Sequence, residues 1–178
     1  RRHGARRRPV STMHTFRSAH VTGASWRDLC DRVLEQTADR PDDGQLAFLY
    51  VADELAGDSD RIVDYLRGHT GVAHWVGCIG MGLCGSGSES YDEAALSVLF
   101  TPYRGDDFRI IPSFDQSPTE WLEATRAWRE RHLASVAVVH GDPTSTQLPT
   151  LLNDLSDGLA GGFLIGGIAS AEQLPVQI

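Results

Sequence analysis

A continuous apolar run of strand length, residues 45–51 (QLAFLYV), lies between two segments with helical periodicity. A run of this kind, preceded by a turn signal such as PDDG, is typical of a strand buried on both faces. A second apolar run, residues 74–79, follows the second helical segment. Strands separated by single helices form βαβ units, so the chain is expected to pack helices against a sheet.

The helical segments are recognised by apolar residues three and four positions apart. In the first segment, Ser25 is the predicted N-cap and Cys30 falls on the apolar stripe, which makes Cys30 a core residue. In the second segment, Ser59 is the predicted N-cap and the helix is expected to stop near Gly68. With a further strand at residues 15–21, the N-terminal half has the predicted order βαβαβ.

The pattern changes after residue 79. Residues 94–100 (AALSVLF) indicate a strand with no helix before it, and residues 108–111 are another short apolar run, so an antiparallel portion is expected. Alternation resumes with a helix starting at Ser117 and Pro118, a strand at residues 135–139, a leucine stripe at residues 148–159 and a strand at residues 163–168. We therefore predict the α/β class, with α+β as the alternative. The expected architecture is a mixed β-sheet flanked by helices, in which the βαβαβ start is followed by an antiparallel portion and a further βαβ unit.

Composition and charge limit the classes of function that the chain can have. The chain has 178 residues, 41% of them hydrophobic and 22% charged, as expected for one folded globular domain. Its formal net charge is −8 although five arginines precede Met13, so the rest of the chain is strongly acidic. This charge opposes contacts with phosphate backbones and argues against nucleic-acid binding. No apolar run reaches the roughly 20 residues of a membrane span, and three unevenly spaced cysteines fit a reducing compartment, so we expect a cytoplasmic protein with no membrane partner.

Two glycine-rich strand ends form the predicted functional site. Glycine within a strand marks a bulge, a turn with positive φ, or the close approach of a ligand or a second backbone. Because two such segments occur, we expect them to converge on one pocket that offers backbone N–H groups and a few hydroxyls to a small polar ligand. The predicted ligand-binding residues are Gly77, Cys78, Gly80, Gly82, Gly166, Gly167 and Ser170.

Several other kinds of site can be considered. Residues 80–85 (GMGLCG) match G-x-G-x-x-G formally, but no helix follows to receive a pyrophosphate, so a glycine-rich bend is favoured over a dinucleotide site. His74, Cys78 and Cys84 supply only three soft ligands at spacings unlike those of zinc sites, so no metal site is predicted. Haem stays open as a cofactor because one axial imidazole is sufficient, and His74 and His140 are the better candidates since they border predicted strands.

An enzyme is the remaining alternative. Cys78 could act as a nucleophile, with His140 as its base and Asp142 as the group that orients the base. The simpler interpretation is that a small cysteine packs well where space is tight and that residues 140–143 (HGDP) form a polar turn. The sequence leaves catalysis open and favours a non-catalytic domain, so no catalytic residue is assigned.

Four segments, taken in order, resemble the FIST N-terminal domain, a sensory domain whose name stands for F-box and intracellular signal transduction. They are residues 45–51, residues 75–89 with the pattern G-C-x-G-x-G at 77–82, residues 94–99, and residues 166–170 (GGIAS). The resemblance covers roughly Met13 to the end. It implies a cytoplasmic domain that senses a small ligand and passes the signal to kinases, cyclases, chemotaxis receptors or F-box machinery. For some members it implies haem-based sensing of nitric oxide.

The resemblance also has consequences for domain organisation. It implies that residues 13–178 form a FIST N-terminal-like sensory domain truncated at its C-terminus, while residues 1–12 are expected to be a disordered arginine-rich extension. The implied partner is a FIST C-terminal domain or a signalling output protein outside this chain. An unpaired sheet edge is expected at residues 164–168, where another strand could pair.

Overall fold

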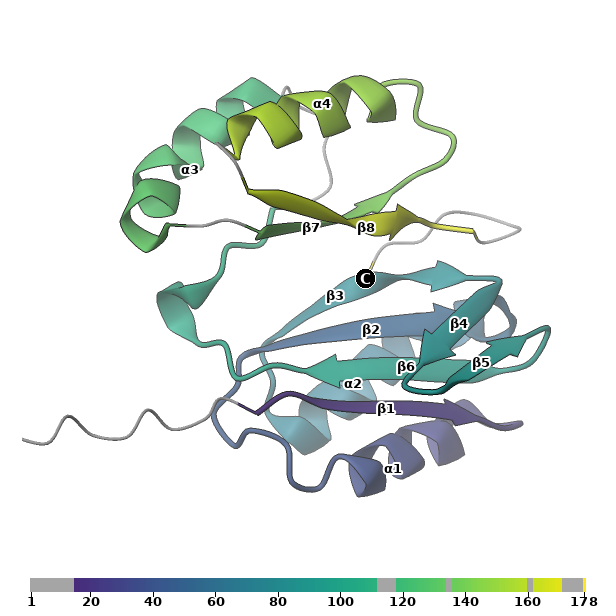
Figure 1. The fold of residues 1–178 in the computed structure, drawn as a ribbon. Coiled ribbons are helices and arrows are strands. Elements are labelled where there is room, and N and C mark those ends of the chain that lie inside the picture. Colours follow the sequence, from purple (N-terminus) through teal and green to yellow (C-terminus); the bar gives the residue numbers. More distant parts are fainter. Residues whose placement is uncertain (1–14, 112–117, 134–135, 160–161, 171–177) are drawn as a thin grey trace, which may run out of the picture.

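A computed structural model describes residues 15–111, 118–133, 136–159, 162–170 and 178. Figure 1 shows four layers: helices α1 and α2, a four-stranded sheet, the strand pair β7–β8, and helices α3 and α4. None of the helices in the described parts combines the length and apolar character that a membrane span needs. The elements are β1 (Arg17–Thr22), α1 (Trp26–Gln36), β2 (Leu46–Ala52), the 3₁₀ helix η1 (Asp53–Asp58), α2 (Ser59–Thr70), β3 (His74–Gly80), β4 (Gly82–Gly85), β5 (Ser88–Tyr91), β6 (Ala95–Phe100), the 3₁₀ helix η2 (Gly105–Asp107), α3 (Pro118–His132), β7 (Val136–Gly141), α4 (Leu148–Gly158) and β8 (Phe163–Ile168).

The main sheet has the strand order β1-β6-β2-β3. Strands β2 and β3 are parallel, whereas β6 runs antiparallel to both of its neighbours, β1 and β2. The predicted α/β class, the βαβαβ start and the antiparallel portion are therefore confirmed. Strand β6 comes from later in the chain and separates β1 from β2.

The core lies between the main sheet and helices α1 and α2. Ala47, Leu49 and Val51 have no exposed surface and belong to one cluster with the apolar faces of both helices. Cys30 lies in this cluster, as predicted, and burial raises the pKa of its thiol to about 12. Phe48 and Tyr50 alternate with these residues and are only partly buried, so the opposite face of the sheet is less tightly covered.

One predicted helix end and one predicted strand were wrong. Helix α2 continues through Gly68 to Thr70 and ends at Gly71, whose φ of 71° is the left-handed conformation that terminates many helices. Gly68 is exposed within the helix, where glycine costs only about 1 kcal/mol and does not stop it. Residues 108–111 form no strand, and the Phe108 ring instead packs edge-on against the His74 imidazole at 5.4 Å.

Strands β7 and β8 are parallel and are connected through α4, which confirms the predicted closing βαβ unit. His140 lies within β7 and not in a turn after the strand, because β7 extends to Gly141. Helix α3 packs on α4, where the Arg129 guanidinium donates hydrogen bonds to the carbonyls of Gly158 and Leu122. The predicted cap Ser117 lies outside the described residues.

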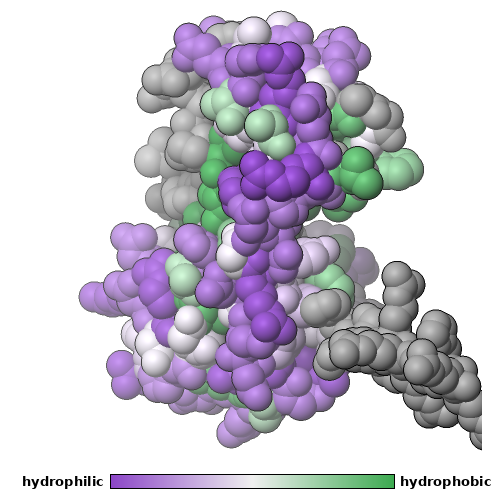
Figure 2. All heavy atoms as spheres, turned by 90° about the vertical axis from the view of Figure 1, so that its left-hand side faces the viewer, coloured by the Kyte–Doolittle hydropathy of each residue, from purple (hydrophilic) through white to green (hydrophobic). Residues whose placement is uncertain are grey.

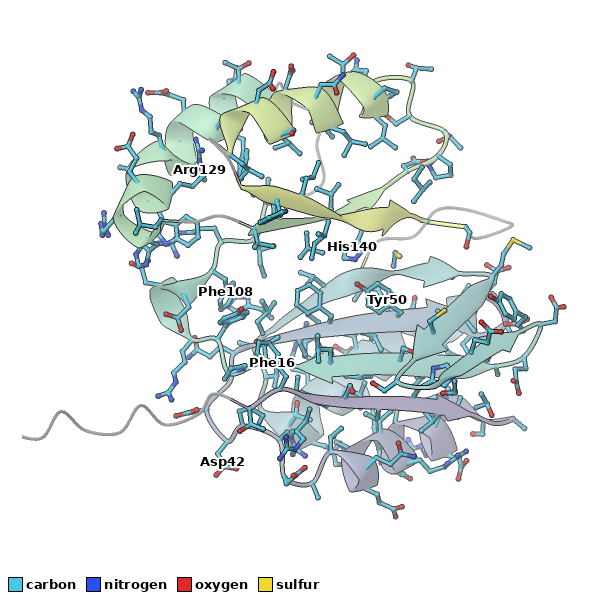
Figure 3. All side chains as sticks on the ribbon, in the orientation of Figure 1. Phe16, Asp42, Tyr50, Phe108, Arg129 and His140 are labelled. Carbon is cyan, nitrogen blue, oxygen red and sulfur yellow. The ribbon has the colours of Figure 1, made fainter. Side chains whose placement is uncertain are left out.

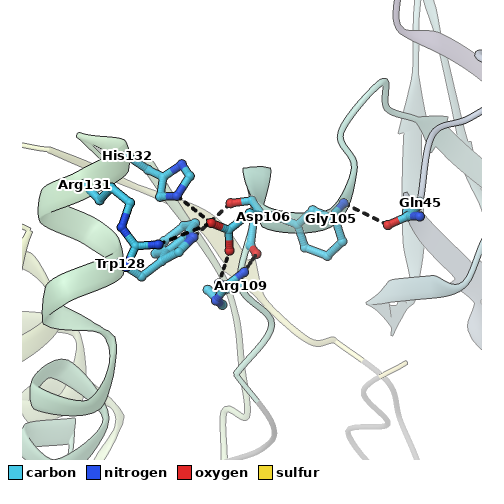
Figure 4. A network of polar contacts seen from close by, with 8 residues as sticks. Gln45, Gly105, Asp106, Arg109, Trp128, Arg131 and His132 are labelled. Atoms are coloured by element: carbon cyan, nitrogen blue, oxygen red, sulfur yellow. Dashed lines mark hydrogen bonds and ion pairs between the residues drawn. The ribbon is translucent and has the colours of Figure 1, made fainter.

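A polar network joins α3 to the chain that leaves the main sheet (Figure 4). Gly105 donates its N–H to the side-chain carbonyl of Gln45 at 2.8 Å. The Asp106 carboxylate pairs with Arg109 and with His132, the latter at 2.8 Å, while the Trp128 indole N–H donates to the Asp106 carbonyl at 2.9 Å. In Figure 2 hydrophilic residues cover much of the face that includes this connection, and hydrophobic residues show on both sides of it.

Candidate functional site

The main sheet and the β7–β8 pair are joined by a hydrogen bond between two aromatic side chains. The Tyr50 hydroxyl lies 3.1 Å from Nε2 of His140, and the two rings meet edge-on with centroids 5.5 Å apart. Figure 3 shows the two side chains pointing toward one another from their separate layers. Tyr50 comes from the middle of β2 and His140 from the end of β7, so this pair links residues 90 positions apart.

Tyr50 belongs to a row of polar residues that crosses all four strands of the main sheet. Cys78 on β3 and Ser97 on β6 are its register partners, and His20 on β1 is the partner of Ser97. Residues in register on neighbouring strands have side chains on the same face. The row therefore lies on the face opposite α1 and α2, with His140 reaching it from the layer above.

The β4–β5 hairpin covers the β1 end of this row. The Ser97 hydroxyl donates to the carbonyl of Cys84 at 3.1 Å, and Nδ1 of His20 lies 2.6 Å from the same hydroxyl oxygen. Because the Ser97 proton is used on Cys84, Nδ1 of His20 must be the protonated donor in this arrangement. A Cβ atom on Gly85 would overlap the His20 side chain, so glycine permits the hairpin to lie directly on the row.

A second link joins the two glycine-rich segments. The Met81 N–H donates to Oγ of Ser170 at 3.0 Å, and a Cβ on Gly80 would lie 3.4 Å from the same oxygen. The end of β3 and the chain just after β8 are therefore adjacent. We call Tyr50, Cys78, Met81, His140 and Ser170 the interlayer site.

The titratable side chains of the interlayer site are held in neutral forms. Burial raises the pKa of the Cys78 thiol and lowers the pKa of His140. Burial also raises the pKa of Tyr50, and the neighbouring Cys78 raises it further. Desolvation disfavours the charged form of each group. Near neutral pH these three residues can recognise a ligand through hydrogen bonds and contribute no formal charge.

The predicted site glycines fall into two groups. A Cβ on Gly77 would overlap the Leu49 carbonyl, and one on Gly82 would overlap the Tyr91 ring, so these glycines make room for the protein itself. Gly166 has a φ of 144° and would meet the backbone of Val139. Open or ordinary contact space remains at Gly80, and at Gly167 no atom lies within 4 Å of a built Cβ.

The contacts of Cys78, His140 and Asp142 bear on the enzyme hypothesis. A raised pKa keeps Cys78 in the thiol form, whereas nucleophilic cysteines need a lowered pKa. Nε2 of His140 faces the Tyr50 hydroxyl. The Asp142 carboxylate accepts hydrogen bonds from the N–H and hydroxyl of Thr144, both at 2.7 Å, which stabilise the turn after β7.

The haem hypothesis concerns His74 and His140, and the metal hypothesis concerns His74, Cys78 and Cys84. His74 is exposed at the start of β3, with its ring against Phe108, and His140 already contacts Tyr50 through Nε2. Within the described residues, no three His, Cys, Asp or Glu side chains are grouped so that they could hold a metal ion.

Sequence analysis missed Tyr50, Ser97 and His20. Tyr50 and Ser97 are hydroxyl residues inside otherwise apolar strand sequences, LAFLYVA and ALSVLF, and buried hydroxyls usually have a partner. These two hydroxyl residues could therefore have been predicted from the sequence to take part in hydrogen bonds. Their alignment in one row depends on the strand order, because β6 pairs with both β1 and β2. The hydrophobic periodicity of a single strand does not predict which strands pair.

Comparison with protein families matches residues 45–177 to the FIST N domain. The matched range begins one residue before β2 and contains all five residues of the interlayer site. Comparisons with curated proteins and with solved structures gave no match.

Proposed function

Because this chain belongs to the FIST N domain family, a family of sensory domains in signal transduction, we propose that its interlayer site binds a small polar ligand. The observation that carries the proposal is the hydrogen bond from the Met81 N–H to Ser170, which brings the two glycine-rich segments together. The Tyr50–His140 pair joins the same two layers. We propose that the ligand carries no charge near neutral pH, because burial favours the uncharged forms of Tyr50, Cys78 and His140.

We infer that ligand binding at the interlayer site alters the packing of β7 and β8 on the main sheet. Two described polar links hold the layers together at this point, one to Tyr50 and one to Met81. A ligand that replaces or bridges these links would change how tightly β7 and β8 are held on the main sheet. A conformational response requires such a difference in ligand contacts between two arrangements.

The proposal can be tested with the full chain in a thermal-shift screen of neutral amino acids, nucleosides and small metabolites. A ligand present at a hundred times its dissociation constant should add about 2.7 kcal/mol to the free energy of unfolding, which gives a clear shift. Gly167→Leu is the blocking variant. Its side chain would enter open space on the His140 face, because Gly167 is in register with His140.

Gly68→Leu is the matched control, since a Cβ at Gly68 also has no atom within 4 Å and that residue lies on the distant helix α2. The expected result is a ligand shift that Gly167→Leu removes and Gly68→Leu keeps, with both unliganded variants melting cooperatively. A shift of equal size in both variants would place the ligand elsewhere.

The output partner is part of the same proposal. We propose that a FIST C-terminal domain or a signalling output protein in the cytoplasm receives the signal, as the sensory role of the family suggests. β8 is the candidate contact, because it carries partly exposed apolar residues along its length and pairs, among the described strands, with β7 on one side.

A further inference from the structure

A cavity of about 230 Å³, partly open to solvent, lies between the β7–β8 pair and α4. Val139 and Gly141 line it and alternate with His140 along β7, so it lies mainly on the face of these strands away from the interlayer site. Its walls include Val139 and Leu164 from the strands and Leu148 and Leu152 from the helix. Every side chain that lines it is aliphatic or is the hydrogen atom of a glycine. The interlayer site contains hydroxyl, thiol and imidazole groups, so the two faces of β7–β8 differ in chemistry.

Glycine backbone forms part of the strand wall of this cavity. The lining glycines are Gly141, Gly166 and Gly167. At Gly141 a Cβ would lie 2.9 Å from the Leu148 side chain, and Gly166 has a φ of 144°, which other residues rarely adopt. Gly141 therefore permits the close approach of Leu148, and Gly166 permits the backbone conformation of β8 beside Val139, so the strand wall at these positions is bare backbone.

We infer that this cavity binds a compact, neutral, apolar molecule, in addition to the polar ligand of the interlayer site. No lining side chain carries a polar atom, so the polar atoms of the wall are limited to backbone groups, and a bound molecule meets mainly aliphatic surface. An apolar cavity of about 150 Å³ in another protein is sufficient for benzene, so about 230 Å³ accommodates a substituted aromatic ring or a short branched alkane. A charged ligand is disfavoured because the walls have no group to pair with it.

Benzene and toluene are the probes for this inference, with benzoate as the charged compound of similar shape. In the full chain we expect toluene to raise the melting temperature in a dose-dependent way and benzoate at the same concentration to leave it unchanged. Leu152→Phe fills the cavity from the helix side and should weaken toluene binding by about tenfold or more. Leu152→Ala enlarges the cavity and should favour larger apolar compounds over benzene.

Leu151→Phe is the matched control, because Leu151 is the neighbouring leucine of the same helix and is not among the lining residues. It should bind toluene as the parent chain does. Gly68→Leu, on the distant helix α2, should also keep toluene binding. No residue of the interlayer site lines the cavity, so failure of the polar-ligand proposal would leave this result intact. Absence of any toluene effect at saturation, or an equal effect of toluene in Leu152→Phe, would overturn the inference.

Discussion

The two halves of the molecule are packed very differently. Between the main sheet and α1 and α2, residues such as Leu29, Leu49 and Ile62 have no exposed surface. In the β7–β8 pair, Phe163 is 70% exposed and Ile165 is 54% exposed. The first half has a continuous apolar core, whereas the second has apolar strands with one covered face. The difference predicts that the α1–α2 half contributes most of the stability of the fold.

The physical reason lies in the sheet type. Parallel strands are normally covered on both faces, and two paired strands alone are marginally stable in water. Helices α3 and α4 cover one face of β7 and β8. On the face toward the main sheet, the contacts described above are a few polar links near the strand ends. Regions with few buried apolar contacts open more easily than the core.

The largest effect is expected from removing core packing in the α1–α2 half. Leu49→Ala should lower the free energy of unfolding by about 3 kcal/mol, because it leaves a cavity in a fully buried position. Ile165→Ala, at a residue that is 54% exposed, should cost less than about 1 kcal/mol. Urea denaturation followed by far-UV circular dichroism measures both. Equal losses would mean that the two halves are packed alike.

An intermediate effect is expected at the link between the halves. His140 has its pKa lowered by burial from its ordinary value of 6.5, so the unfolded chain binds a proton more readily than the folded chain. The contribution of His140 to the free energy of unfolding is therefore complete above the pKa that this residue has in the unfolded chain. It is lost as the pH falls through the lower pKa that the residue has in the folded chain. Between about pH 7.5 and about pH 5.5 the melting temperature should decrease, and His140→Gln should reduce this decrease.

Tyr50→Phe separates the hydrogen bond from the titration. It removes the partner of His140 and should cost about 1 kcal/mol at neutral pH, while leaving the histidine able to titrate. The acid sensitivity should therefore persist in Tyr50→Phe. If His140→Gln keeps the full sensitivity, the titrating group lies elsewhere.

The same contrast explains what the sequence could predict. The elements of the α1–α2 half follow from local signals. The apolar run at residues 45–51 forms β2, the helical stripe with Cys30 forms α1, and the apolar run at residues 74–79 forms β3. The closing βαβ unit also has a local pattern, the leucine stripe of α4 between two apolar strands. Such periodicity is enough to identify elements because each one buries a single face.

The candidate site is harder to predict because it depends on contacts between distant segments. The adjacency of Met81 and Ser170 agrees with the expected convergence of the two glycine-rich segments. The β4–β5 hairpin within the first segment was not predicted, since its four-residue strands are short and polar. Nor does sequence show which glycines accommodate protein atoms, as Gly77 and Gly82 do, and which face open space, as Gly167 does.

The smallest effect is expected from the polar network that ties α3 to η2. Arg109 and His132 hold the pKa of Asp106 below its usual range, but the carboxylate is at the surface, where ion pairs contribute little. Asp106→Asn retains the main-chain carbonyl that accepts from Trp128 and removes the charge pairing. We expect no resolvable change in the midpoint of global unfolding.

The informative measurement for this variant is local. Amide hydrogen exchange should become faster in α3 and remain unchanged in α1, because only the α3 end loses an anchor. Asp64→Asn is the matched control, since Asp64 also forms an exposed ion pair, with Arg67 at 3.2 Å, but within the single helix α2. Added salt should reduce the difference between Asp106→Asn and the parent chain, because exposed charges are screened. Faster exchange in both halves would show that the network stabilises the whole fold, and the division into a stable half and a half that opens more easily would then be wrong.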